Sequence, residues 1–187
     1  MVKARTTRTE RFEDIVNEVF EPLQKYLYRR MHADSVDDVL SETLMVVWRR
    51  LDEVPPDASL PWCYGVARKV LSNHRRGDQR RLRLVDRLTA EPAPVASAPQ
   101  GIDHGDPDLE AALELLSHQE RELIHLWAWE QLEPREIALV VESTPNAISL
   151  RLSRAKQKLA NSLERQNRPA SGHSPDKQVP ESSVGEQ

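Results

Sequence analysis

The chain has 187 residues, a formal net charge of −4 and a charged fraction of 30%, and only 5% of its residues are aromatic. This length suits one large domain or two small helical ones, with cores built mainly from Leu, Val and Ile. The single cysteine, Cys63, excludes an internal disulfide and any site with several cysteine ligands. No apolar run approaches 18 residues and the charged N-terminus lacks an apolar core, so we expect no membrane insertion and a cytoplasmic protein.

Helical periodicity dominates the first part of the chain, and no stretch alternates like a strand. A stripe over Phe12–Leu27 is interrupted by Pro22, which predicts two short helices or one kinked helix. The clearest amphipathic pattern runs over Val36–Leu51 and includes Trp48 on its apolar side. Ser35, followed three positions later by an acidic residue, resembles a capping box that opens this helix.

After Pro55-Pro56 a third helix is expected from about Leu60 to beyond Arg76, with Ser59 as its N-cap. The periodicity then fails over residues 89–107, a Pro-rich and acidic stretch that reads as a flexible linker. Past residue 166 the sequence is polar and lacks an apolar stripe, which predicts a disordered tail.

Helical patterns resume at Pro107, which follows Asp106, and proline is favourable in the first turn of a helix. Ser117 with Glu120 forms a capping box, and the helix that follows is expected to bury Leu123, Ile124 and Trp127. Two further helices are expected to begin at Pro134 and Pro145.

Charge is segregated along the chain. Residues 68–87 hold eight basic and two acidic side chains, and residues 148–168 hold six basic side chains and one Glu. Between them, residues 110–142 hold eight Glu and two Arg. Two basic patches on an acidic protein indicate two separate contacts with a polyanion.

The segment Glu133–Leu159 is typical of a helix-turn-helix, although an ordinary solvated basic helix is the plainer alternative. A short helix buries its apolar face, a brief turn follows at Glu142, and Thr144 caps the next helix. Such motifs often have Gly at the turn, so Glu142 implies some conformational cost. The second helix would place its first turn on base edges and its basic flank on phosphates.

The first part of the chain carries a second set of motifs. They are Asp37-Asp38-Val39, Ser41-Glu42-Thr43, Trp48-Arg49 and the run Trp62-Cys63-Tyr64-Gly65-Val66-Ala67-Arg68. With Arg151-Leu152-Ser153-Arg154-Ala155 in the second part, the chain resembles the extracytoplasmic-function subfamily of RNA polymerase sigma factors. The resemblance covers roughly residues 12–83 and 109–163, in the family's order and spacing.

The resemblance implies an all-α fold of two small helical domains, the sigma region 2 bundle (9–85) and the sigma region 4 helix-turn-helix (107–165). They would be joined by a flexible acidic linker (86–106) and followed by the disordered tail (166–187). In the family the linker runs through the polymerase active-site cleft, and a passive tether is the alternative.

The resemblance also implies three sets of binding residues. Core RNA polymerase would be bound by Asp37, Asp38, Glu42, Trp48 and Arg49. The minus-10 promoter element would be bound by Asp57, Ser59, Leu60, Trp62, Arg68, Lys69, Asn73, Arg75 and Arg76. The minus-35 element would be bound by Asn146, Ala147, Ser149, Leu150, Arg151, Arg154, Lys156 and Lys158. The partners are then core RNA polymerase and promoter DNA, with an anti-sigma factor as a candidate third, and the protein would be nucleoid-associated.

An enzyme is not expected. The six histidines are scattered without paired-ligand spacing, and the chain has no Gly-rich phosphate-binding loop, so we expect no metal and no cofactor. The competing interpretation is a stand-alone helix-turn-helix regulator that binds DNA as a dimer, without polymerase.

Overall fold

The computed structural model describes residues 7–89 and 106–166, and this part of the chain contains helices and no strands. The helices are α1 (Arg8–Tyr28), α2 (Val36–Arg49), α3 (Ser59–Thr89), α4 (Pro107–Glu114), α5 (His118–Ala128), α6 (Pro134–Val141) and α7 (Pro145–Gln166). Short 3-10 turns at Ala33–Ser35 and Leu51–Glu53 flank α2. The predicted all-α fold is confirmed. Most of the predicted linker and nearly all of the predicted tail lie outside the described residues.

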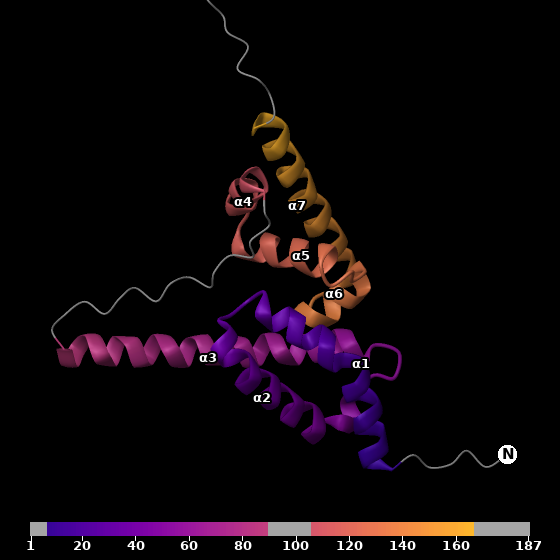
Figure 1. Cartoon of the computed structure of the whole chain (residues 1–187). Coiled ribbons are helices and arrows are strands. Elements are labelled where there is room, and N and C mark those ends of the chain that lie inside the picture. Colours follow the sequence, from indigo (N-terminus) through magenta and orange to yellow (C-terminus); the bar gives the residue numbers. More distant parts are fainter. Residues whose placement is uncertain (1–6, 90–105, 167–187) are drawn as a thin grey trace, which may run out of the picture.

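The first three helices pack on one another around a Val- and Leu-rich core (Figure 1). α1 is one helix with Pro22 inside it, so the alternative of two short helices is wrong. Pro22 has no N–H and so removes one backbone hydrogen bond from the helix. The burial of Val19, Leu23 and Tyr26, on both sides of Pro22, stabilises the helix by more than this loss.

The predicted capping box at Ser35 is also wrong. Ser35 ends a 3-10 turn with φ −106° and ψ −2°, and its side chain makes no capping hydrogen bond. An N-cap side chain reaches the first-turn N–H groups from an extended backbone, which the preceding turn prevents here.

The second part of the described chain is the four-helix unit α4–α7. Asp106 caps α4 by accepting hydrogen bonds from the backbone N–H groups of Asp108 and Leu109. The capping box of Ser117 and Glu120 opens α5 as predicted. Leu123 and Ile124 are buried as predicted, but Trp127 is 43% exposed and Leu126 fills the core position instead.

The two halves pack against each other through α3 and α6. Figure 1 shows α6 at the end of the second half that faces the first half. α3 runs along the whole first half and continues to Thr89, past the predicted boundary at residue 85. α7 leads away from this contact, and the buried residues of both halves belong to one hydrophobic cluster. No helix in the described ranges is long and apolar enough to cross a membrane.

Candidate nucleic-acid interface

The charged residues predicted to bind polymerase share the exposed face of α2. Asp37, Asp38, Glu42 and Arg49 are all exposed, while the opposite face of the helix is buried against α1 and α3. The amphipathic period of α2 therefore turns four charges toward solvent on one surface. This surface can make charged contacts with a partner protein without disturbing the core.

Trp48, which the sequence pattern places on the apolar stripe, is at the edge of this surface instead. Its side chain is 37% exposed, and its ring meets Phe12 edge-on with centroids 5.1 Å apart. The Arg8 guanidinium lies 5.1 Å from the same ring. Phe12 and Arg8 thus hold the indole in place, and its exposed part can meet a partner.

The loop before α3 is built differently from the prediction. Ser59 is the first residue of α3 rather than its N-cap, and its buried hydroxyl donates to Glu18 Oε2 at 2.8 Å. The N-cap prediction fails because the helix starts one residue earlier, with the Trp62 N–H bonded to the Ala58 carbonyl. Asp57 is exposed and Leu60 is half-buried.

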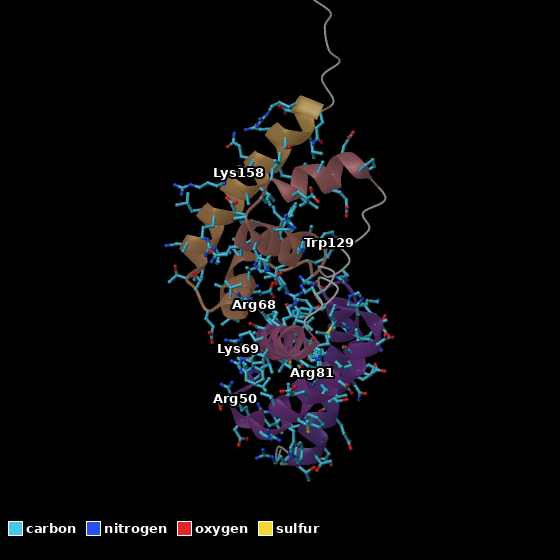
Figure 2. All side chains as sticks on the ribbon, turned by 90° about the vertical axis from the view of Figure 1, so that its left-hand side faces the viewer. Arg50, Arg68, Lys69, Arg81, Trp129 and Lys158 are labelled. Carbon is cyan, nitrogen blue, oxygen red and sulfur yellow. The ribbon has the colours of Figure 1, made fainter. Side chains whose placement is uncertain are left out.

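The basic residues of α3 are held by neighbouring groups. Lys69 forms an ion pair with Glu142, and Arg75 donates to the Arg30 carbonyl. Arg76 and Asn73 are exposed and hydrogen-bonded to each other at 2.6 Å. Trp62 and Arg68 are half-buried, and Figure 2 shows Arg68 and Lys69 at the junction of the two halves.

α6 and α7 form the predicted helix-turn-helix. The Ala147 N–H donates to the Thr144 hydroxyl at 3.3 Å, which caps α7, and Pro145 is its first residue. Ile148, Leu152 and Ala155 are buried, as the periodicity predicts. The exposed side of the first two turns carries Asn146, Ser149 and Leu150, with Ala147 half-buried beside them.

The basic flank of α7 is partly engaged with α5. Arg151 donates to the Gln119 side chain, and Lys158 forms an ion pair with Glu120. The hydrogen bonds from Lys158 and Ser117 lower the pKa of Glu120 to about 2. Lys156 lies 3.3 Å from the centre of the Trp127 ring, which explains why this tryptophan is at the surface. Arg154 is exposed.

Glu142 adopts the left-handed conformation at the turn between α6 and α7, with φ 54° and ψ 55°. A side chain at this position clashes with its own carbonyl, so the conformational cost inferred from the sequence is present. The carboxylate accepts a hydrogen bond from Lys69, which lowers its pKa. The turn therefore contacts the first half through the Glu142 side chain, which a glycine at this position would lack.

Replacing Glu142 with Gly is expected to raise the thermal midpoint by about 2–4 °C, because the backbone strain is relieved. The matched control is Gln131→Gly, which also removes a left-handed residue (φ 57°) but leaves Lys69 untouched. Calorimetry of both variants measures the effect. If the thermal midpoint falls in Glu142→Gly but not in Gln131→Gly, the contact with Lys69 stabilises the fold by more than the backbone strain costs.

A polar cluster that the sequence pattern does not reveal lies between the halves. Glu130, which follows α5, is buried and accepts hydrogen bonds from Arg29, Arg30 and Tyr64 of the first half. Glu122 adds a second carboxylate, 3.6 Å from Arg30 Nε. Of these residues only Tyr64 belongs to a sequence motif, and only the packing of the halves identifies the cluster.

An open cleft of about 1060 Å³ borders this cluster. Its lining combines basic side chains of α3, and Arg29 and Arg30 just after α1, with acidic side chains of α4 and α5 and with Glu142. A cleft lined by charges of both signs is not an anion site of the kind that a nucleotide needs.

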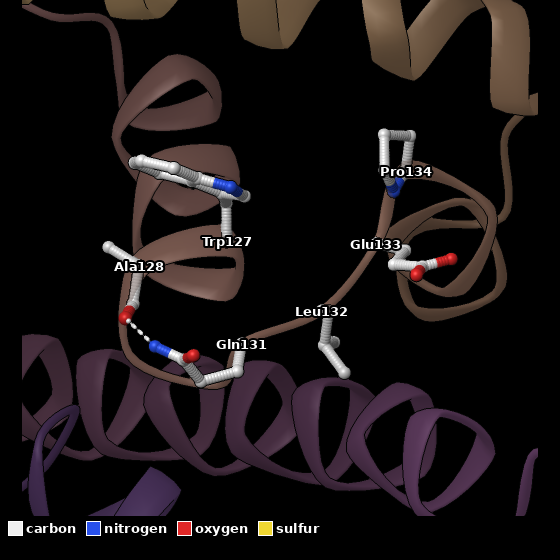
Figure 3. A pocket seen from close by; sticks show the side chains of 6 residues that line it. All are labelled: Trp127, Ala128, Gln131, Leu132, Glu133 and Pro134. Atoms are coloured by element: carbon white, nitrogen blue, oxygen red, sulfur yellow. Dashed lines mark hydrogen bonds between the residues drawn. The ribbon is translucent and has the colours of Figure 1, made fainter.

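A smaller pocket of about 350 Å³ lies where α5 turns into α6 (Figure 3). It is lined by Trp127, Ala128, Gln131, Leu132, Glu133 and Pro134, and the Gln131 side chain donates to the Ala128 carbonyl beside it. Only one ionisable side chain lines it, so it offers no acid–base pair. In the described ranges, no three His, Cys, Asp or Glu side chains are grouped so that they could hold a metal ion.

Comparison with known proteins supports the fold. No protein-family model matches the chain, and no curated protein matches it. Among solved structures, the sigma factor RpoE in complex with the anti-sigma factor NepR from Bartonella quintana matches with a TM-score of 0.58 and 22% identity, over 84% of this chain and 98% of that one. The PhyRSL–NepR complex from Sphingomonas sp. Fr1 matches with a TM-score of 0.59 and 14% identity, over 89% and 99%. CnrH in complex with the cytosolic domain of CnrY matches with a TM-score of 0.54 and 22% identity, over 83% and 89%. The chain therefore has the fold of a two-domain sigma factor.

Proposed function

We propose that the chain is a sigma factor of the extracytoplasmic-function type. It binds core RNA polymerase, recognises the minus-35 and minus-10 promoter elements and promotes strand opening. The observation that carries the proposal is the pairing of two motif sets, in the family's order, on a fold shared with the sigma factor RpoE. Either set alone fits other classes of DNA-binding protein.

In this proposal residues 9–85 form the unit that binds polymerase and the minus-10 element, and residues 107–165 form the unit that binds the minus-35 element. Residues 86–106 connect them, and no role is assigned to 166–187. The exposed charges of α2 support polymerase docking, and the loop at Asp57 with the basic residues of α3 supports capture of the opened strand. Aromatic and basic side chains on one helix suit unstacked bases and phosphates.

A protein that binds and inhibits the factor is the third proposed partner. RpoE is matched in its complex with the anti-sigma factor NepR, and PhyRSL and CnrH are likewise matched in complexes with NepR and CnrY. We assign no catalytic activity to the chain, and we place it in the cytoplasm at the nucleoid with polymerase and DNA.

The test is run-off transcription with purified core RNA polymerase, with and without the chain, on a library of promoter fragments. We expect specific transcripts and co-purification of the chain with core enzyme. The competing regulator interpretation predicts tight, sequence-specific binding of duplex DNA by the chain alone and no association with polymerase. That outcome would overturn the proposal.

Arg154 is proposed to contact a phosphate of the minus-35 element. Arg154→Gln in the holoenzyme should weaken binding to all promoters by a similar factor and reduce the slope of log affinity against log salt by about one unit. Arg165→Gln, the same change at the far end of α7, is the control and should leave the slope unchanged. A reordered promoter preference in Arg154→Gln would assign this residue to base recognition instead.

A further inference from the structure

The outward face of α7, which forms one edge of the second half (Figure 1), carries no charge along its centre. Ile148, Leu152 and Ala155 are buried, so the helical period of about 3.6 residues fixes which positions lie directly opposite them. These positions, all of them exposed, hold Asn146, Leu150, Ser153 and Gln157, which we call the central stripe of α7. An uncharged stripe on a basic helix suits base edges better than phosphates.

Basic side chains lie beside the central stripe, and two of them are engaged with α5. Arg151 donates to the Gln119 side chain at 2.8 Å, and Lys158 is ion-paired with Glu120. Arg154 is exposed and makes neither a hydrogen bond through its side chain nor an ion pair within the described part of the chain. Arg154 is therefore the cation that can hold a phosphate next to the stripe without giving up a contact of the fold.

The side chains of the first two turns differ in the contacts that they can still make. Ser149 Oγ donates to the Pro145 carbonyl at 2.9 Å, so its single hydroxyl hydrogen is already used. The Asn146 amide makes no hydrogen bond among the described residues, which leaves its two donors and its carbonyl oxygen available. Leu150 is 53% exposed and offers only apolar atoms. The stripe thus presents one amide and, one helical turn later, one branched apolar group.

An amide and an apolar group at this spacing match two base edges of the major groove. An Asn amide pairs with N6 and N7 of adenine, and an apolar side chain packs on the C5-methyl group of thymine. Guanine has an acceptor where the Asn oxygen would lie, and cytosine lacks the methyl group. Four residues span about 6 Å of helix, and stacked bases are about 3.4 Å apart, so the two contacts fall about two base pairs apart.

We propose that α7 reads an adenine through Asn146 and the methyl group of a thymine through Leu150, about two base pairs apart in the minus-35 element. The inference rests on the proposed function, and it adds the base identities and the atoms that are read. Arg154 holds the neighbouring backbone. Sequence preference then depends on one amide and one methyl contact, and not on the arginine–guanine pairs that are the commonest specific contact of basic helices.

Base analogues test the two contacts separately, in the holoenzyme bound to a promoter fragment selected by the transcription assay. Each adenine of the minus-35 element is replaced in turn by 7-deazaadenine, which lacks N7, and each thymine by uracil, which lacks the methyl group. Both analogues keep normal base pairing. We expect one 7-deazaadenine to weaken binding about fivefold, the effect of one hydrogen bond, and one uracil to weaken it about fourfold, the effect of one buried methyl group.

Two variants assign each sensitive base to its side chain. With Leu150→Ala the uracil should cost nothing further, whereas the 7-deazaadenine should still weaken binding about fivefold. With Asn146→Ala the pattern should be reversed. Both side chains are exposed, so circular dichroism should be unchanged. The matched control is Leu115→Ala, which removes a leucine that is 70% exposed in the same half but outside α7, and it should keep both sensitivities.

The outcomes separate this inference from the proposed function. Specific transcription together with a minus-35 element in which no analogue weakens binding would overturn the base assignment alone. The same holds if the uracil and 7-deazaadenine effects persist in both variants, because the bases would then be read by other side chains. If the wild-type chain with core polymerase gives no specific transcript, the proposed function itself fails, and the base assignment fails with it.

Discussion

Reversing two charges on α2, Asp38→Arg with Glu42→Arg, is expected to lower affinity for core RNA polymerase at least about a hundredfold. Both side chains are exposed on the surface proposed to dock, and like charges placed against each other at an interface cost several kcal/mol. Because neither side chain is part of the core, the helix content should not change. Co-purification with core enzyme and circular dichroism together measure the effect.

The control for this variant is Glu13→Arg with Asp14→Arg on α1. It changes the net charge by the same amount in the same half, on exposed residues of another helix. Retained binding in this control and loss in the α2 variant would locate the docking surface on α2. Undiminished binding of the α2 variant would remove α2 from the proposed interface.

Replacing Arg30 with Met is expected to lower the free energy of unfolding by about 3 kcal/mol, because removal of one partner leaves buried carboxylates uncompensated. The Arg30 side chain is 6% exposed, contacts Glu130 and Glu122, and stacks 3.7 Å from the centre of the Tyr26 ring. Burial lowers the pKa of Arg30, but its interactions with Tyr26, Glu122 and Glu130 more than offset this effect, and the pKa is raised. Urea denaturation followed by circular dichroism measures the change.

Two companion variants make this prediction specific. Arg50→Met removes an arginine whose partner, Glu53, is exposed on the same turn, and its denaturation midpoint should be nearly unchanged. Arg30→Met combined with Glu130→Gln should cost less than the sum of the single changes, because the two side chains are in contact. Additive losses would mean that Arg30 acts through Tyr26 rather than through Glu130.

Local features of the sequence were sufficient to predict most of the helices. The apolar period of α2 predicts its buried face, and the Ser117 capping box and the prolines at 107, 134 and 145 predict where four helices begin. These signals act within one or two turns, so they do not depend on the rest of the fold. The helix-turn-helix is predictable for the same reason, down to the strained residue Glu142.

The predictions for Trp48, Trp127 and Ser59 were wrong, and each of these residues contacts another helix. Trp48 and Trp127 have positions on apolar stripes, yet both are at the surface, where Arg8 and Lys156 from other helices lie over their rings. Ser59 was expected to cap α3, but its hydroxyl donates to Glu18 of α1. In each case a residue distant in sequence offers a better contact than the local one.

The sequence by itself therefore determined the helices, the helix-turn-helix and the family resemblance, because periodicity, caps and motifs depend only on residues that are close together in the chain. Only the tertiary structure decided how the halves meet. Arg30 and Glu130 are 100 residues apart and match no local pattern, so nothing near either residue indicates a partner. Their pairing exists because the packing of the halves buries both side chains, just after α1 and just after α5, and a buried charge needs a partner of opposite sign to replace its lost water.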